Sequence, residues 1–113
     1  MRCFVDASPT RACVVFEGKK DISFRQSASA KYTNNEAEYR AVLFALWWAR
    51  NLKYNLTEIC SDSQLVVNQL NGTYKVNKKE LVELREAVLA KTNGKVKFIW
   101  VRREDNPAGK VLG

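Results

Sequence analysis

Three short strand patterns stand close together before a long helical pattern, and this order limits the folds that the chain can adopt. An apolar run at residues 3–5 ends at Asp6 and is followed by a turn at Ser8-Pro9. Residues 11–17 and 21–28 form the next two runs, and Gly18 opens the turn between them. Neighbouring strands joined by short turns predict an antiparallel meander.

A helix is predicted next, over residues 36–52, which contain good helix formers and no glycine or proline. Thr33 and Glu36 form a capping box at its start, because a hydroxyl and a carboxylate three residues apart can satisfy two free amides. The later elements are strands at 57–61 and 95–101, helices at 63–70 and 77–91, and a helix starting at Asn106-Pro107. This order predicts an α/β fold in which helices pack against a five-stranded mixed sheet. We expect residues 1–113 to form a single domain.

The middle of the long helix, residues 41–49, is apolar around much of its circumference. Such a helix is expected to be well buried, so we predict that Trp47 and Trp48 are core residues and not platforms for stacking bases. The run is far shorter than the roughly 20 residues that a membrane span needs. Residues 1–20 contain no basic segment followed by a long apolar run, so we expect no secretory signal. We therefore expect a cytoplasmic protein that has no membrane partner.

The chain has three cysteines, Cys3, Cys13 and Cys60, and no Cys-x-x-Cys pair. An odd number without this spacing argues against a disulfide framework or a zinc site and favours a reducing compartment. All three lie in predicted strands, where we expect them to be small buried apolar side chains.

Two features of the composition restrict the chemistry. The chain has no histidine, which excludes Ser/His/Asp and Cys/His catalysis and an imidazole general base. Its net charge is +7, from 19 basic and 12 acidic residues. Residues 1–74 carry nine basic and seven acidic side chains, whereas residues 75–113 carry ten and five. This uneven excess indicates a polyanionic partner, although a basic surface can also serve solubility alone.

Three acids occupy similar places. Asp6 ends the first strand, Asp62 follows the fourth strand, and Glu38 lies in the first turn of the long helix. Carboxyl ends of strands are where open α/β sheets place their sites, and clustered carboxylates bind hard divalent cations. Two such ions about 4 Å apart can drive phosphodiester hydrolysis without histidine. Each acid could also be an ordinary turn, cap or helix-start residue.

Four segments together resemble type 1 ribonuclease H, in that family's order and over almost the whole chain. They are Phe4-Val-Asp-Ala-Ser8, Thr33-Asn-Asn-Glu-Ala-Glu-Tyr39, Ser61-Asp-Ser-Gln-Leu-Val-Val67 and Trp100-Val-Arg-Arg-Glu-Asp-Asn106. The resemblance implies a ribonuclease H-like fold and hydrolysis of the RNA strand of RNA/DNA hybrids, leaving 3′-hydroxyl and 5′-phosphate ends. It also implies that Asp6, Glu38 and Asp62 hold two catalytic ions, either Mg²⁺ or Mn²⁺.

The same resemblance implies that the hybrid is contacted by hydroxyl and amide side chains. These are Ser8, Thr33, Asn34, Asn35 and Gln64. Amides and hydroxyls can bind sugar hydroxyls and base edges without repelling phosphate. Thr33 and Asn34 could instead serve only to cap the helix.

The chain departs from the family at the fourth carboxylate, which is expected in the first turn of the last helix. Counting from Asn106 puts Lys110 in its place, and a protonated lysine cannot bind Mg²⁺. We expect the amide oxygen of Asn106 to act as the fourth ligand, although Asn106 could be only an N-cap before Pro107. Two nearby acids, Glu104 and Asp105, are further candidates. Such a site is expected to be less active and to favour Mn²⁺.

These features predict a metal-dependent ribonuclease H that acts as a monomer, and no protein partner is implied. The alternative from another class is a module of the same fold that binds hybrid or double-stranded RNA and has lost cleavage. A third reading is a nuclease-fold domain of a larger polymerase or integrase assembly. Cleavage of labelled hybrid in the presence of divalent cations separates the first reading from the second.

Overall fold

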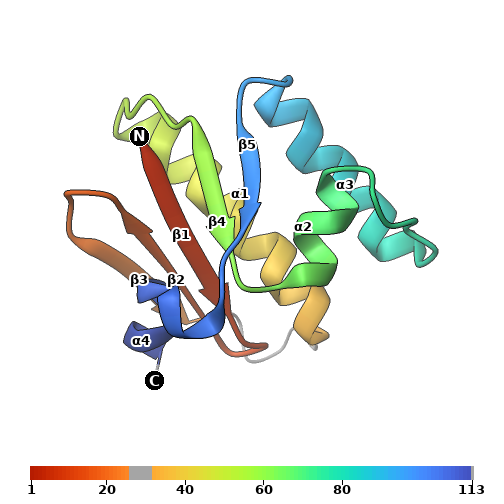
Figure 1. Ribbon diagram of the computed structural model, residues 1–113, viewed down its shortest axis with the longest axis horizontal. Helices are drawn as coiled ribbons and strands as arrows, with labels where there is room; N and C mark the ends of the chain where they lie inside the picture. The colour runs from red at the N-terminus through yellow and green to blue at the C-terminus, as the bar shows by residue number, and fades with distance from the viewer. Residues whose placement is uncertain (26–31, 113) are drawn as a thin grey trace.

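The computed structural model of the chain describes residues 1–25 and 32–112. Five strands form one sheet in the order β3-β2-β1-β4-β5 (Figure 1). They are β1 (Arg2–Ala7), β2 (Arg11–Phe16), β3 (Asp21–Arg25), β4 (Glu58–Ser61) and β5 (Lys97–Trp100). β1, β2 and β3 pair antiparallel, whereas β4 is parallel to β1 and to β5. The predicted mixed sheet is confirmed. Residues 26–28 of the predicted third strand lie outside the described residues.

The helices follow the predicted order with small differences at their ends. They are α1 (Asn34–Asn51), α2 (Gln64–Leu70), α3 (Lys79–Thr92) and α4 (Pro107–Leu112), and a short 3-10 turn, η1 (Arg103–Asp105), precedes α4. The predicted capping box is present, because Oγ1 of Thr33 accepts from the amide of Glu36 at 3.2 Å and Glu36 accepts from the amide of Thr33 at 3.3 Å. The third helix begins two residues later than predicted, since Lys78 is extended and its side chain provides no cap.

The buried apolar positions of α1 are mainly alanines, together with Tyr39 and Val42, and do not include its tryptophans. Ala37, Ala41, Ala45 and Ala49 recur every four residues and are almost fully buried. Alanines at this spacing allow the helix to lie close to the elements that it covers. The expectation that Trp47 is a core residue was wrong, because its side chain is 53% exposed. Trp48 is half-buried against the core, and the two rings are in edge contact 5.0 Å apart.

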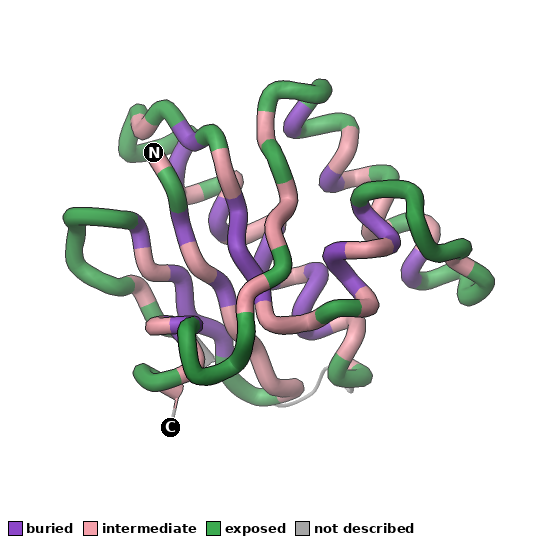
Figure 2. Tube along the Cα trace, viewed as in Figure 1, coloured by how far each residue is buried: buried purple, intermediate pink, exposed green. Residues whose placement is uncertain are grey.

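The core lies around β1, β2 and β4, where Figure 2 shows buried positions along the central strands. Cys3, Cys13 and Cys60 are buried and unpaired there, as expected. In the view of Figure 1, α1 runs behind the sheet, and α4 lies beside the ends of β1 and β2. Among the described residues, no helix combines the length and apolar character that crossing a membrane would need.

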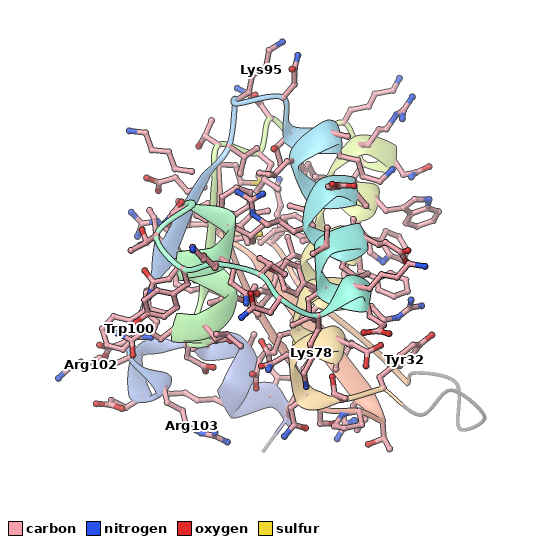
Figure 3. All side chains as sticks on the ribbon, turned by 90° about the vertical axis from the view of Figure 1, so that its right-hand side faces the viewer. Tyr32, Lys78, Lys95, Trp100, Arg102 and Arg103 are labelled. Carbon is pink, nitrogen blue, oxygen red and sulfur yellow. The ribbon has the colours of Figure 1, made fainter. Side chains whose placement is uncertain are left out.

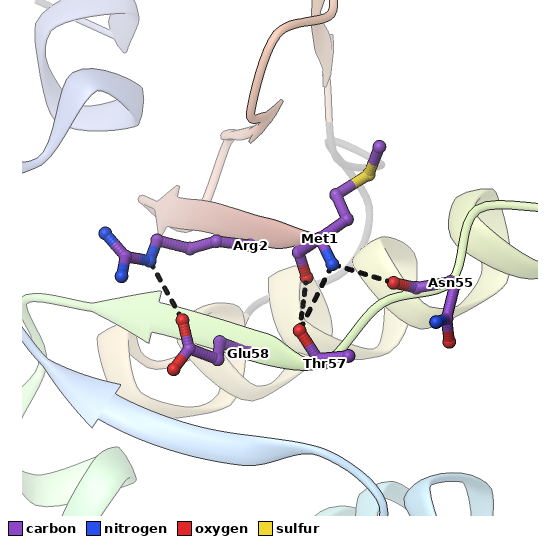
Figure 4. A network of polar contacts seen from close by, with 5 residues as sticks. All are labelled: Met1, Arg2, Asn55, Thr57 and Glu58. Carbon is purple, nitrogen blue, oxygen red and sulfur yellow. Dashed lines mark hydrogen bonds and ion pairs between the residues drawn. The ribbon is translucent and has the colours of Figure 1, made fainter.

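Polar contacts join the start of β1 to the segment that leads into β4 (Figure 4). The amino group of Met1 donates to the carbonyl of Asn55 at 2.9 Å and to Oγ1 of Thr57 at 3.1 Å. Nε of Arg2 pairs with Glu58 at 3.0 Å, although both side chains are partly exposed and such a pair adds little stability. These contacts join the start of β1 to the start of β4, and the parallel pairing of the two strands places their carboxyl ends side by side.

Candidate active site

The parallel pairing of β1 with β4 brings two acids together. Val5 is opposite Ser61 in this register, so Asp6 and Asp62 lie beside each other at the carboxyl ends of neighbouring strands. Glu38 reaches the same point from the N-terminal part of α1, where the capping box starts the helix. Ligand oxygens from these three acids all lie within 4.8 Å of one another. The three acids that the sequence analysis placed at strand ends and at a helix start therefore lie close together in the structure.

Each of these acids has a different local environment. Oε1 of Glu38 accepts from the amide of Ala7 at 3.0 Å. Its other oxygen, Oε2, is buried and has no hydrogen-bond partner among the described residues. Asp6 and Asp62 are half-buried, whereas Glu38 is only 8% exposed. The set thus contains one deeply buried acid and two that face the solvent side of the cleft.

Burial and mutual repulsion alter the protonation of the acids. Burial, together with the negative charge of Asp6, raises the pKa of Glu38 to about 8. The amide of Ala7 opposes this effect but does not cancel it. Burial and the charge of Asp62 also raise the pKa of Asp6, while Arg103 acts in the opposite direction. Carboxyl groups with pKa values raised in this way are concentrated at functional sites.

The acids open into a cleft of about 410 Å³. Of the residues predicted to contact substrate, Ser8, Asn34 and Asn35 line this cleft together with the three acids. Thr33 does not line it and caps α1. Gln64 is the exposed first residue of α2, directly after Ser63, and it too lies outside the cleft lining.

The side chain of Asn106 is at the site but is turned in an unexpected way. It is fully buried. Its amide nitrogen, Nδ2, donates to the carbonyl of Val5 at 2.9 Å and to Oδ2 of Asp62 at 3.1 Å. Its amide oxygen accepts from the amide of Ala108 at 3.1 Å, which makes it the cap of α4. The oxygen that was expected to bind a cation is therefore engaged by the backbone.

The first turn of α4 faces the acids through a glycine. A Cβ atom added to Gly109 would lie 3.4 Å from Oδ2 of Asp6 and 3.7 Å from Oδ2 of Asp62. Lys110, which the count from Asn106 placed at the fourth carboxylate, is exposed and does not line the cleft. The residue of this turn that lies beside Asp6 and Asp62 is therefore Gly109, one position before Lys110.

The sequence did not single out two arginines that also line the cleft, Arg11 on β2 and Arg103 in η1. Arg103 has an adjacent arginine, Arg102, whose Nε is 2.9 Å from Asp105 and 3.7 Å from Glu104. No periodicity within a three-residue 3-10 turn tells which of two neighbouring arginines faces a cleft. Only the regional excess of basic residues pointed to this surface.

Comparisons with known proteins agree with this fold and site. Residues 7–112 match the family described as Reverse transcriptase-like. The bifunctional protein Rv2228c of Mycobacterium tuberculosis is 34% identical over 83 residues, which cover 72% of this chain and 23% of that protein. The chain thus spans about a quarter of the length of this curated relative.

Solved structures extend the comparison. RNase H1 of the archaeon Halobacterium salinarum has a TM-score of 0.82 at 23% identity and covers 98% of this chain and 92% of its own. The N-terminal RNase H domain of Rv2228c gives 0.73 at 26% identity, covering 99% and 95%. LC11-RNase H1, solved in complex with an RNA/DNA hybrid, gives 0.75 at 22% identity and covers 99% of both chains. The fold is that of a type 1 ribonuclease H. The chain belongs to the Reverse transcriptase-like family.

Proposed function

We propose that this chain is an endoribonuclease that hydrolyses the RNA strand of RNA/DNA hybrids. The convergence of Asp6, Glu38 and Asp62 in one cleft carries the proposal, because a cluster of this kind can bind cations that drive phosphodiester hydrolysis without histidine. The substrate class is supported by the family and by the hybrid bound to LC11-RNase H1, a protein of the same fold. One chain supplies the whole cleft, so we propose that the enzyme acts as a monomer.

We further propose that the three acids hold a pair of divalent cations, Mg²⁺ or Mn²⁺. The buried Oε2 of Glu38 lacks a hydrogen-bond partner among the described residues, which fits an oxygen reserved for a cation. The raised pKa of Glu38 fits as well, because its negative charge is poorly stabilised by the protein alone. Hard cations prefer oxygen ligands of this type.

The chemistry follows from the position of the acids. When bound, divalent cations would favour ionisation of the attacking water and stabilise the departing oxygen. Asp6, Glu38 and Asp62 would hold these cations in the cleft. A bond forms between the water oxygen and phosphorus as the bond to the 3′ oxygen breaks, and a proton passes to that oxygen. The products carry 3′-hydroxyl and 5′-phosphate ends.

The cleft lining fits a hybrid that is held by its backbone. Asn34, Asn35 and Ser8 offer hydrogen-bonding groups without negative charge, which suits sugar hydroxyls and phosphates. Arg11 and Arg103 add positive charge at the edges of the acidic cluster. Thr33 and Gln64 lie next to this surface and are proposed as outer contacts. Binding of this kind depends strongly on salt and only weakly on base sequence.

The test is a cleavage assay on three labelled substrates, namely an RNA/DNA hybrid, duplex RNA and duplex DNA. Each is incubated with Mg²⁺ or Mn²⁺ and with EDTA. We expect cleavage of only the RNA strand of the hybrid, only with cation, and loss of cleavage in Asp6→Asn. Hybrid binding without cation-dependent cleavage would reject the enzyme.

One observation favours a second candidate, a hybrid- or double-stranded-RNA-binding module with little or no cleavage. α4 brings Gly109 and Lys110 to the region where the family pattern has a carboxylate. The two candidates differ in turnover. The enzyme cleaves hybrid and should lose cleavage in Asp62→Asn. A binding module has little or no cleavage to lose, and Asp62→Asn should leave its affinity for hybrid unchanged or stronger because a negative charge is removed.

A further inference from the structure

We propose that Asn106 and Trp100 are positioning residues that hold Asp62 in place for cation binding: the side chain of Asn106 binds the carboxylate of Asp62, and the indole of Trp100 binds its main-chain carbonyl. The catalytic meaning of this inference rests on the proposed function. Its physical content, the dependence of cation affinity on these two residues, rests on the proposed cation site but does not require that the chain cleaves hybrid.

Asn106 can hold Asp62 because its amide has only one favourable orientation. Nδ2 lies between two oxygens, the carbonyl of Val5 and Oδ2 of Asp62. Oδ1 faces the amide of Ala108. Reversing the amide would set oxygen against both acceptors and the NH₂ group against a donor, and full burial denies it water as a substitute partner. The group that Asn106 presents to Asp62 is therefore a donor and not a ligand oxygen.

The same contact joins two strands and a helix. Val5 belongs to β1 and directly precedes Asp6, while Asp62 directly follows β4. A single NH₂ group from the start of α4 thus binds the backbone beside one acid and the carboxylate of the other. A carboxylate with one oxygen fixed in this way loses rotational freedom and keeps its remaining lone pairs for a cation.

Trp100 holds the main chain of Asp62 from the other side. Its indole Nε1 donates to the carbonyl of Asp62 at 3.2 Å, although the ring is 46% exposed. Next to it, the amide of Val101 donates to the carbonyl of Ser61 at 3.0 Å. Figure 3 shows Trp100, Arg102 and Arg103 at one end of the molecule, on the segment that leads from β5 into α4. Residues 100–106 therefore hold Asp62 at both its carbonyl and its carboxylate.

This arrangement explains how a site with three acids could work without a fourth on α4. A missing ligand makes the geometry of the remaining ones more important, and hydrogen-bonding groups behind metal ligands commonly change affinity 10–100-fold when removed. In this arrangement Asn106 does not bind the cation itself but fixes the orientation of Asp62, which does.

The experiment measures binding of Mn²⁺ to the whole chain by titration calorimetry, without nucleic acid. We expect Asn106→Ala to lower Mn²⁺ affinity by about 10–100-fold and Trp100→Phe, which loses one hydrogen bond, by a smaller factor. Gln69→Ala is the matched control, because Gln69 is also a buried amide bonded to a side chain and to a carbonyl, but on α2 away from the acids. It should lower the thermal midpoint and leave Mn²⁺ affinity unchanged.

A second variant separates positioning from direct ligation. Asn106→Asp removes the donor and adds a carboxylate, so a direct ligand role predicts tighter Mn²⁺ binding, whereas the positioning role predicts weaker binding. Unchanged or tighter binding in this variant, or unchanged binding in Asn106→Ala, overturns the inference. If Asn106→Ala does not fold, as circular dichroism would reveal, Trp100→Phe decides the question in the same assay.

The outcome can be distinguished from failure of the proposed function. If the unaltered chain binds Mn²⁺ but does not cleave hybrid, the proposed activity fails and the inference stands on the affinities. If it cleaves hybrid and the Asn106 variants bind Mn²⁺ normally, the inference fails alone. If the unaltered chain shows no saturable Mn²⁺ binding at millimolar concentration, the inference fails, and the cleavage assay alone decides the proposed activity. In an active enzyme, Asn106→Ala should also raise the Mn²⁺ concentration needed for half-maximal cleavage, a shift that a smaller folded fraction alone would not produce.

Discussion

Glu38→Gln should change how the stability of the cation-free protein depends on pH. Burial, followed by the charge of Asp6, raises the pKa of Glu38 from 4.5 to about 8. Below about pH 4.5 the carboxyl is protonated in both folded and unfolded chains, and its stabilising contribution is complete. As pH rises towards 8, only the unfolded chain releases the proton, so the free energy of unfolding falls. Above about pH 8 the loss is complete.

The size of the effect follows from the two pKa values. A difference of about 3.5 pH units at about 1.36 kcal/mol per unit gives a loss of about 5 kcal/mol for Glu38. That is comparable with the whole stability of a small domain, which is about 5–15 kcal/mol. Glutamine carries no charge, so Glu38→Gln should remove most of this slope. The raised pKa of Asp6 leaves a smaller slope of the same sign.

The assay is urea unfolding at pH 5, 7 and 8.5 in EDTA, followed by circular dichroism. At pH 8.5 we expect Glu38→Gln to be more stable than the unaltered chain, with the same dependence on urea concentration. Mg²⁺ at about 100 times its dissociation constant should restore about 2.7 kcal/mol to the unaltered chain but much less to Glu38→Gln. Glu86→Gln, which replaces an exposed glutamate of α3, is the control. Equal slopes for Glu38→Gln and Glu86→Gln would refute the reasoning.

Three other substitutions test separate parts of the site and core. Arg103→Ala should raise the KM for hybrid about tenfold, or about 1.4 kcal/mol, whereas Arg102→Ala should not; equal effects in steady-state kinetics would contradict the assignment of Arg103 to the cleft. Gly109→Asp adds a carboxylate beside Asp6, so calorimetry should show tighter Mn²⁺ binding, and unfolding in EDTA above pH 8 should show a less stable protein. Trp47→Ala should cost less than about 1.5 kcal/mol in urea unfolding because much of the ring is already in water; a loss of about 3–5 kcal/mol, typical of a buried aromatic residue, would show that the ring is part of the core.

The local parts of the fold were predictable because their causes lie within a few residues. The capping box depends on two side chains three residues apart, and the contacts of Thr33 with Glu36 are present as predicted. The burial of Cys3, Cys13 and Cys60 follows from their places in apolar strands. Trp47 was wrongly predicted because α1 is apolar on several sides. The sequence of the helix alone does not indicate which of its apolar sides is buried against the sheet. In the structure, the side that carries the alanines is the buried one.

The site itself depends on contacts that are distant in sequence. Asp6 and Asp62 meet through the parallel register of β1 and β4, and the position of a strand end beside another is a property of the sheet. Asn106 is 101 residues from Val5, the residue whose carbonyl it binds. A motif could indicate that Asn106 belongs to the site, but an amide has a donor end and an acceptor end. Only the surrounding atoms decide which end faces Asp62.

The absence of a carboxylate from the first turn of α4 changes the charge balance of the cleft. Burial and then repulsion among the acids raise the pKa values of Glu38 and Asp6, and a fourth acid would add to this repulsion in the cation-free protein. Asn106 instead places a donor against Asp62, and Gly109 places no side chain there. Both favour a stable cation-free fold and leave fewer ligands for a second cation.

We therefore expect the first cation to bind the chain alone, and the second to bind only when phosphate oxygens of the hybrid complete its coordination. Half-maximal cleavage should then need more Mn²⁺ than half-saturation of the free chain, because the rate depends on the weaker of the two sites. Comparing the Mn²⁺ dependence of cleavage, at saturating hybrid, with the calorimetric titration tests this expectation. Coincident midpoints would mean that one cation, or two held equally well by the protein, is sufficient for the reaction.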